Sequence, residues 1–124
     1  MEKAMIIDDS RAMRRILGET VRELGFEVSE ASNGREALAK LDNMGPPVRL
    51  MLVDWNMPEM NGLEFVTQLR QDERFEGSLI VMVTTETAID QILNALEAGA
   101  NEYVMKPFTK EIIQGKLRLL GLLN

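Results

Sequence analysis

Three short apolar runs in this chain end in charged residues, and this pattern limits the possible folds most strongly. The runs and the charges that follow them are Met5–Ile7 with Asp8 and Asp9, Leu50–Val53 with Asp54, and Tyr103–Met105 with Lys106. A short apolar run bounded by polar residues is typical of a strand buried on both faces, as in parallel sheets covered by helices. The carboxyl ends of parallel strands meet at one edge, where open α/β sheets bind ligands. The pattern therefore predicts three carboxylates and one lysine at that edge.

Strand-like and helix-like segments alternate along the whole chain, which favours repeated βα units. Strands are predicted at about residues 3–8, 27–31, 50–54, 79–83 and 102–105. Helices are predicted at about residues 11–24, 35–42, 63–69 and 88–98, and from about 109 onward. Right-handed crossovers give a doubly wound α/β fold, a parallel five-stranded sheet with helices on both faces. The 124 residues fit a single domain, since domains commonly contain roughly 100 to 150 residues.

Helix signals support these assignments. Ser10 can cap a helix that begins near Arg11, and Gly25 follows its end at the expected position. The helix predicted at 88–98 has its large apolar residues on one face: Ile89, Ile92, Leu93 and Leu96. Pattern alone does not give the order of the strands in the sheet.

The composition excludes several classes of function. The chain contains no cysteine and no histidine, which excludes disulfides, thiolate nucleophiles, histidine general bases and Cys/His zinc sites. Its net charge of -6 opposes binding to nucleic acid or to anionic membrane surfaces. The first apolar run is too short for a signal peptide or a membrane span. We therefore expect a soluble cytoplasmic protein whose chemistry uses carboxylates, hydroxyls, lysine or a hard metal.

The predicted edge offers a site for a divalent cation beside an anion. Asp8, Asp9 and Asp54 can supply the oxygen ligands that Mg²⁺ prefers. Two unit charges ~4 Å apart interact by about 4 kcal/mol at an effective dielectric of 20, so a cation or Lys106 must offset the repulsion. A carboxylate can also attack phosphorus to form an acyl phosphate, and the Thr84 hydroxyl could bind a phosphoryl oxygen.

Each of these residues also has a plainer explanation. An aspartate pair can cap a helix, a lone lysine after an edge strand is usually solvated, and threonine is common in strands. The joint pattern is much less expected by chance than any one member.

Four groups of residues together resemble the receiver domain of two-component response regulators, and within that family the single-domain chemotaxis regulators. They are Ile7-Asp8-Asp9-Ser10 with Met13-Arg14-Arg15-Ile16, Val53-Asp54-Trp55-Asn56-Met57-Pro58 with Met60-Asn61-Gly62, Met82-Val83-Thr84, and Tyr103-Val104-Met105-Lys106-Pro107-Phe108-Thr109. The match covers almost the whole chain. It implies a flavodoxin-like fold with the strand order 2-1-3-4-5.

The resemblance implies a phosphoacceptor and a metal site. Asp54 would accept a phosphoryl group from a phosphohistidine on a sensor histidine kinase, so the missing histidine belongs to the partner. Mg²⁺ would be held by Asp9, Asp54 and the backbone carbonyl of Asn56. Asp8 would act mainly through water.

The resemblance also implies a switch. Lys106 and Thr84 would each contact a phosphoryl oxygen. Thr84 would move toward the phosphoryl group and the ring of Tyr103 would turn inward, which alters the face built from the fourth helix, the fifth strand and the last helix. The new charge of about -1.5 to -2 drives this change. Asn56 and Glu86 match positions that tune attack of water on the acyl phosphate, so autodephosphorylation is expected.

The implied partners are a sensor histidine kinase as phosphodonor, an output protein such as the flagellar motor switch, and a phosphatase. The protein would be a monomer that catalyses only its own phosphorylation and dephosphorylation. A receiver domain of another phosphorelay, or of a larger regulator, is the alternative. The chain ends soon after the last predicted helix, which favours a whole protein.

Two further alternatives come from other classes. A phosphatase of the haloacid dehalogenase type also uses an aspartate nucleophile and Mg²⁺, but it has a second aspartate two residues later, where this chain has Asn56. A purely structural interaction domain would have no use for Mg²⁺ and would gain by losing the cluster of like charges.

Overall fold

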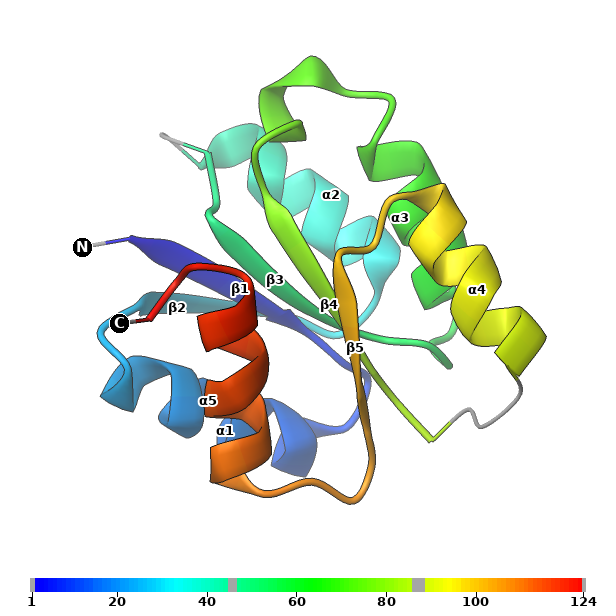
Figure 1. Ribbon diagram of the computed structural model, residues 1–124. Coiled ribbons are helices and arrows are strands. Elements are labelled where there is room, and N and C mark those ends of the chain that lie inside the picture. The colour runs from blue at the N-terminus through cyan, green and yellow to red at the C-terminus, as the bar shows by residue number, and fades with distance from the viewer. Residues whose placement is uncertain (1, 45–46, 86–88, 124) are drawn as a thin grey trace.

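A parallel sheet lies at the centre of the computed structural model, which describes residues 2–44, 47–85 and 89–123 (Figure 1). Within these residues the strands are β1 (Lys3–Ile7), β2 (Glu27–Ala31), β3 (Leu50–Asp54), β4 (Leu79–Thr84) and β5 (Glu102–Met105). Neighbouring strands all pair in parallel, in the order β2-β1-β3-β4-β5. The predicted doubly wound sheet and its strand order are confirmed.

Helices cover both faces of the sheet and make a three-layer fold (Figure 1). The helices are α1 (Arg11–Glu23), α2 (Gly34–Asn43), α3 (Gly62–Leu69), α4 (Ile89–Ala98) and α5 (Lys110–Leu119), with a short 3-10 helix η1 (Glu73–Phe75). One face carries α1 and α5, and the other carries α2, α3 and α4.

The two faces explain why the central strands are continuously apolar. In β3, Leu50 and Leu52 join the core with α1 and α5, whereas Met51 and Val53 join the core with α2, α3 and α4. Successive side chains of a strand point to opposite faces, so a strand covered on both sides needs apolar residues at every position. The edge strands β2 and β5 are only partly buried and carry polar residues such as Glu30.

Side-chain caps fix the starts of four helices. Ser10 accepts a hydrogen bond from a backbone N–H of the first turn of α1, and Asn33 and Thr109 do the same for α2 and α5. Asn61 and Glu64 form a capping box at the start of α3. Each cap satisfies a backbone donor that the helix itself leaves without a partner. These helix starts follow the carboxyl ends of β1, β2, β3 and β5, at the edge of the sheet where the charged residues were predicted to meet.

Most predicted boundaries agree with the structure to within one or two residues, but two features differ. The η1 turn was not predicted. The residues Ile89 and Leu93, predicted on the apolar face of α4, are 72% and 49% exposed. Because α4 lies at the end of its helical layer, beside α3, only a narrow stripe that includes Ala95 is buried. The predicted helix start at Ala88 lies outside the described residues.

Gly62 allows α3 to begin directly against β3. Its N–H donates to the carbonyl of Trp55 at 2.8 Å. A Cβ atom at this position would lie 2.4 Å from the backbone oxygen of Asp54 and 2.8 Å from Cε of Met82. The backbone that carries Asp54 is therefore in direct contact with the first turn of α3.

We predict that Gly62→Ala destabilises the protein by roughly 1 to 3 kcal/mol, because the added methyl group meets backbone that no side-chain rotation can relieve. Gly115→Ala is the matched control in α5, since a Cβ atom there meets nothing within 4 Å. The control should stabilise the helix by roughly 0.5 to 1 kcal/mol. Urea unfolding measures both effects, and equal free energies of unfolding for the two variants would contradict this account.

Candidate functional site

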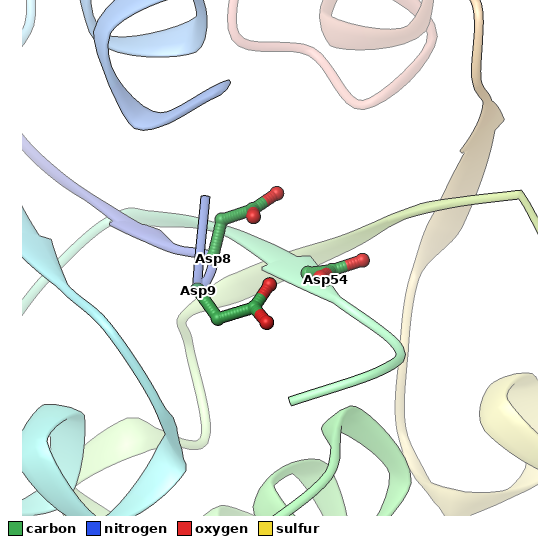
Figure 2. Close-up of side chains that lie close together, drawn as sticks. All are labelled: Asp8, Asp9 and Asp54. Atoms are coloured by element: carbon green, nitrogen blue, oxygen red, sulfur yellow. The ribbon is translucent and has the colours of Figure 1, made fainter. Parts of the chain in front are cut away.

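Three carboxylates converge beyond the carboxyl ends of β1 and β3. Asp8 and Asp9 follow β1, and Asp54 is the last residue of β3. One oxygen atom from each lies within 4.8 Å of the others (Figure 2). Asp8 and Asp54 are only 1% and 7% exposed, whereas Asp9 is open to solvent. The structure thus brings together the three acids that the strand pattern singled out.

Lys106 reaches this cluster from the end of β5. Its Nζ lies 3.2 Å from Oδ2 of Asp8 and 3.2 Å from Oδ1 of Asp54. Its backbone N–H donates to the carbonyl of Thr84 at 2.8 Å, which holds the backbone of Lys106 beside the end of β4. The peptide bond to Pro107 is cis. One ammonium group therefore bridges the two buried carboxylates and leaves the cluster with a net negative charge.

The electrostatics of the cluster favour a further cation. Burial raises the pKa of Asp54 from 3.8 to about 6, and the charge of Asp8 adds to this effect. Lys106 lowers the pKa of Asp54 but does not cancel the increase. For Lys106, burial disfavours the ammonium, but the charges of Asp54 and Asp8 outweigh burial and raise its pKa. The lysine is therefore protonated at neutral pH, and the carboxylates still repel one another.

The residues of the predicted switch lie on the two neighbouring strands. Thr84 is the last residue of β4 and is 1% exposed. Asp54 pairs with Val83 in the sheet, so Thr84 lies one residue beyond it at the same edge. Tyr103 lies in β5, partly buried, and Nζ of Lys116 is 4.9 Å from the centre of its ring.

Two residues, Asn56 and Glu86, are predicted to tune hydrolysis. Asn56 lies in the exposed loop after β3, two residues beyond Asp54. Glu86 lies outside the described residues. The roles of both, and that of the Asn56 carbonyl as a metal ligand, stay predictions.

The donor atoms at this edge fit Mg²⁺. This ion prefers oxygen ligands in octahedral geometry and keeps several waters, so one or two carboxylates with a substrate phosphate suffice. The two buried acids supply fixed oxygens, and the exposed Asp9 leaves one side open to water and to a phosphodonor.

Sequence reasoning missed one residue at this site. Nη1 of Arg14, in α1, donates to the backbone carbonyl of Asp8 at 2.7 Å. Arg14 stands in the pattern that follows the aspartate pair, but its partner is a main-chain oxygen. A backbone acceptor leaves no signature in the sequence.

Comparison with known proteins identifies the family. Residues 4–118 match the response regulator receiver domain. The chain belongs to this family. It is similar to the chemotaxis protein CheY1 of Helicobacter pylori, with 44% identity over 119 residues that cover 95% of each protein. It is also similar to the chemotaxis protein CheY of Pseudomonas aeruginosa, with 40% identity over 116 residues that cover 93% of this chain and 92% of the relative.

A solved structure agrees with the fold of this receiver domain. The chemotaxis protein CheY4 of Vibrio cholerae has a TM-score of 0.88 at 34% identity, and the match covers 96% of this chain and 98% of that one. Receiver domains are signalling switches rather than ordinary enzymes, and they bind Mg²⁺ at an acidic pocket. Among the described residues, no helix is both long and apolar enough to cross a membrane.

We predict that Asp54→Asn makes the metal-free receiver domain more stable at pH 7, by about 1 to 3 kcal/mol. The folded pKa of about 6 exceeds the ordinary value of 3.8, so the wild type loses stability as the pH rises between these values. An amide does not ionise, so the difference between the two proteins should shrink as the pH falls toward 4. Urea unfolding in EDTA from pH 4 to pH 8 measures it.

Asp90→Asn is the control, because it removes the same charge from an exposed position on α4. It should change stability little. A gain for Asp54→Asn that is constant across the whole pH range would contradict the assignment to a buried, ionising carboxylate.

Proposed function

We propose that this receiver domain is the phosphoacceptor switch of a two-component system, and that Asp54 is the residue phosphorylated. One observation carries the proposal: a buried aspartate at a strand end, 3.2 Å from a lysine and clustered with two further acids. This arrangement offers a nucleophile, a counter-charge and hard metal ligands in one place. Receiver domains of this family take phosphate from histidine kinases, so the proposed phosphodonor is a phosphohistidine on a sensor histidine kinase.

In the proposed reaction, a carboxylate oxygen of Asp54 attacks phosphorus, the phosphorus–nitrogen bond breaks, and its electron pair stays on the donor imidazole. The product is an acyl phosphate on Asp54. Lys106 already lies beside Asp54 and neutralises charge on a phosphoryl oxygen, while the Thr84 hydroxyl binds another. When bound by Asp8, Asp9 and Asp54, Mg²⁺ supplies the remaining charge neutralisation.

Phosphorylation then shifts the protein between two conformations. The phosphoryl group brings a charge of about -1.5 to -2 and replaces the single charge of the Asp54 carboxylate, so the balance of ion pairs around Lys106 changes. Thr84 and Tyr103 lie on adjacent strands, and movement of the first gives room for the ring of the second. The face of α4, β5 and α5 changes as a result. The exposed Ile89 and Leu93 of α4 offer apolar contact area for an output protein there.

The similarity to chemotaxis proteins over 95% of the chain supports a chemotaxis role, with an output partner such as the flagellar motor switch. We propose that residues 1–124 act as one cytoplasmic, monomeric receiver domain that catalyses only its own phosphorylation and dephosphorylation. Asn56 and Glu86 set the rate of hydrolysis, alone or with a phosphatase. A receiver role in another phosphorelay is the second candidate.

We expect acetyl phosphate with Mg²⁺ to add one phosphoryl group to the protein, detected by intact-mass spectrometry. Asp54→Asn should not be labelled, because the nucleophile is gone. Asp90→Asn should be labelled like the wild type, since Asp90 is exposed on α4 and is not one of the three clustered acids. Labelling of Asp54→Asn at the wild-type rate would contradict the assignment of Asp54 as the phosphorylated residue.

Trp55 gives an independent test of the metal site. It follows Asp54 directly and is 7% exposed, so a cation bound by Asp54 changes its surroundings. Its fluorescence should change and saturate as Mg²⁺ is added, and Asp9→Asn should shift the titration to higher Mg²⁺ concentrations. A flat wild-type titration would count against the metal site.

A further inference from the structure

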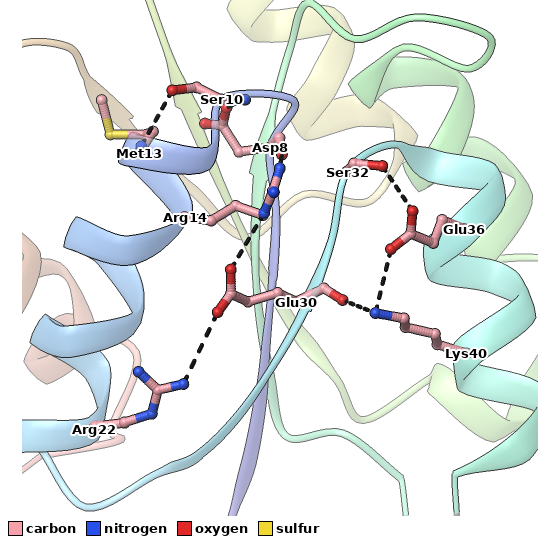
Figure 3. Close-up of polar contacts among 9 residues, drawn as sticks. All are labelled: Asp8, Ser10, Met13, Arg14, Arg22, Glu30, Ser32, Glu36 and Lys40. Carbon is pink, nitrogen blue, oxygen red and sulfur yellow. Dashed lines mark hydrogen bonds and ion pairs between the residues drawn. The ribbon is translucent and has the colours of Figure 1, made fainter.

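The side chain of Arg14 connects α1, β2 and the segment that carries the two aspartates. Its Nη1 donates to the backbone carbonyl of Asp8 at 2.7 Å, and its Nε donates to Oε1 of Glu30 at 3.2 Å (Figure 3). The side chain is only 17% exposed although it is charged. A largely buried arginine therefore binds the backbone of the residue that begins the acidic cluster.

The carbonyl that Arg14 binds belongs to the peptide unit that joins Asp8 to Asp9. This unit is planar and rigid, so fixing its oxygen also fixes the direction in which the chain enters Asp9. The other polar groups of Asp8 are engaged elsewhere: its N–H donates to the carbonyl of Ala31 at 3.1 Å, and its Oδ1 accepts from the N–H of Ser10 at 2.8 Å. Arg14 therefore supplies the bond that orients the Asp8–Asp9 peptide plane.

Glu30 is itself held from two sides. Its Oε2 lies 4.0 Å from Nη2 of Arg22 in α1, and its backbone carbonyl accepts a hydrogen bond from Nζ of Lys40 in α2 (Figure 3). Lys40 also pairs with Glu36 at 3.2 Å. Glu30, which orients the Arg14 guanidinium, is thus held by α1 through its carboxylate and by α2 through its backbone carbonyl.

We propose that Arg14 is a positioning residue for the divalent cation. It acts through the backbone carbonyl of Asp8, and Glu30 sets the orientation of its guanidinium. This inference rests on the proposed Mg²⁺ site, and it assigns to Arg14 no contact with the ion or with phosphate. The guanidinium holds the Asp8–Asp9 peptide so that the carboxylate of Asp9 faces those of Asp8 and Asp54.

Positioning by Arg14 and simple charge repulsion between Arg14 and the cation predict opposite results, which makes the proposal testable. Arg14 is positively charged, so through space it repels a cation, and its removal would strengthen Mg²⁺ binding if charge alone mattered. Loss of its hydrogen bond frees the peptide plane, and Mg²⁺ binding then has to order that plane again. Removal of Arg14 therefore weakens Mg²⁺ binding if positioning dominates.

The experiment is a Mg²⁺ titration followed by Trp55 fluorescence, with the wild type, Arg14→Gln and Arg15→Gln. Arg15 is the matched control, because it is the next residue of the same helix, has the same charge and pairs with Glu19 in solvent, 82% exposed. For Arg14→Gln we expect half-saturation at a Mg²⁺ concentration roughly three- to tenfold higher. Arg15→Gln should stay within about twofold of the wild type.

Arg14→Lys separates geometry from charge and serves as the second variant if Arg14→Gln does not fold. A lysine keeps the charge, but its single ammonium lacks the fork that spans Glu30 and the Asp8 carbonyl. Its half-saturation should therefore also move to higher Mg²⁺. At saturating Mg²⁺, labelling of folded Arg14 variants by acetyl phosphate should reach the wild-type extent, since Arg14 does not touch the phosphoryl group.

The outcomes are distinct. If the wild type gives no fluorescence response, the metal site itself fails. If the wild type responds and both Arg14 variants bind Mg²⁺ as tightly as it does, or more tightly, the positioning role is overturned while the metal site stands. Labelling of the Arg14 variants that stays low at saturating Mg²⁺ would also overturn it, because a direct part in the chemistry would then be required.

Discussion

The ammonium of Lys106 between Asp8 and Asp54 is the interaction on which the site depends. One oxygen of Asp8 lies within 4.8 Å of one oxygen of Asp54. Two buried carboxylates this close repel by roughly several kcal/mol unless a positive charge lies between them. Burial first, and then the charge of Asp8, keep the pKa of Asp54 raised although Lys106 lowers it. The cluster therefore retains enough negative charge to attract a metal ion. A second fixed cation in the same place would remove that attraction.

The sheet connects the charged site at Lys106 with the outer face formed by α4, β5 and α5. Lys106 continues from β5, and its N–H is bonded to the carbonyl of Thr84 at the end of β4. Tyr103 stands three residues earlier on the same strand and pairs with Met82 of β4. Asp54 ends β3, Thr84 ends β4, and Tyr103 and Lys106 lie in and just after β5, so these groups occupy three adjacent strands. A shift at the end of one strand therefore acts directly on its neighbour.

Sequence patterns predicted those parts of the fold that local chemistry decides. The bounds of β3 follow from its continuous apolar residues, and the start of α1 follows from Ser10, because burial on both faces and capping both leave direct signatures. The turn η1 and the exposure of Ile89 depend on how helices meet in three dimensions. The acids were found because charges at strand ends share one edge. Arg14 was missed because its partners are a backbone oxygen and a glutamate sixteen residues away.

The three charged groups at the centre of the site come from distant parts of the chain. The contacts of Lys106 with Asp54 and Asp8 span 52 and 98 residues in sequence. Contacts of such long range form only when the intervening strands are in place, because loop closure must precede them. A chain still emerging from the ribosome, or one cut before β5, holds its acids without their counter-charge. The counter-charge therefore reaches the two acids only once β5 has joined the sheet, so a complete site requires an assembled sheet.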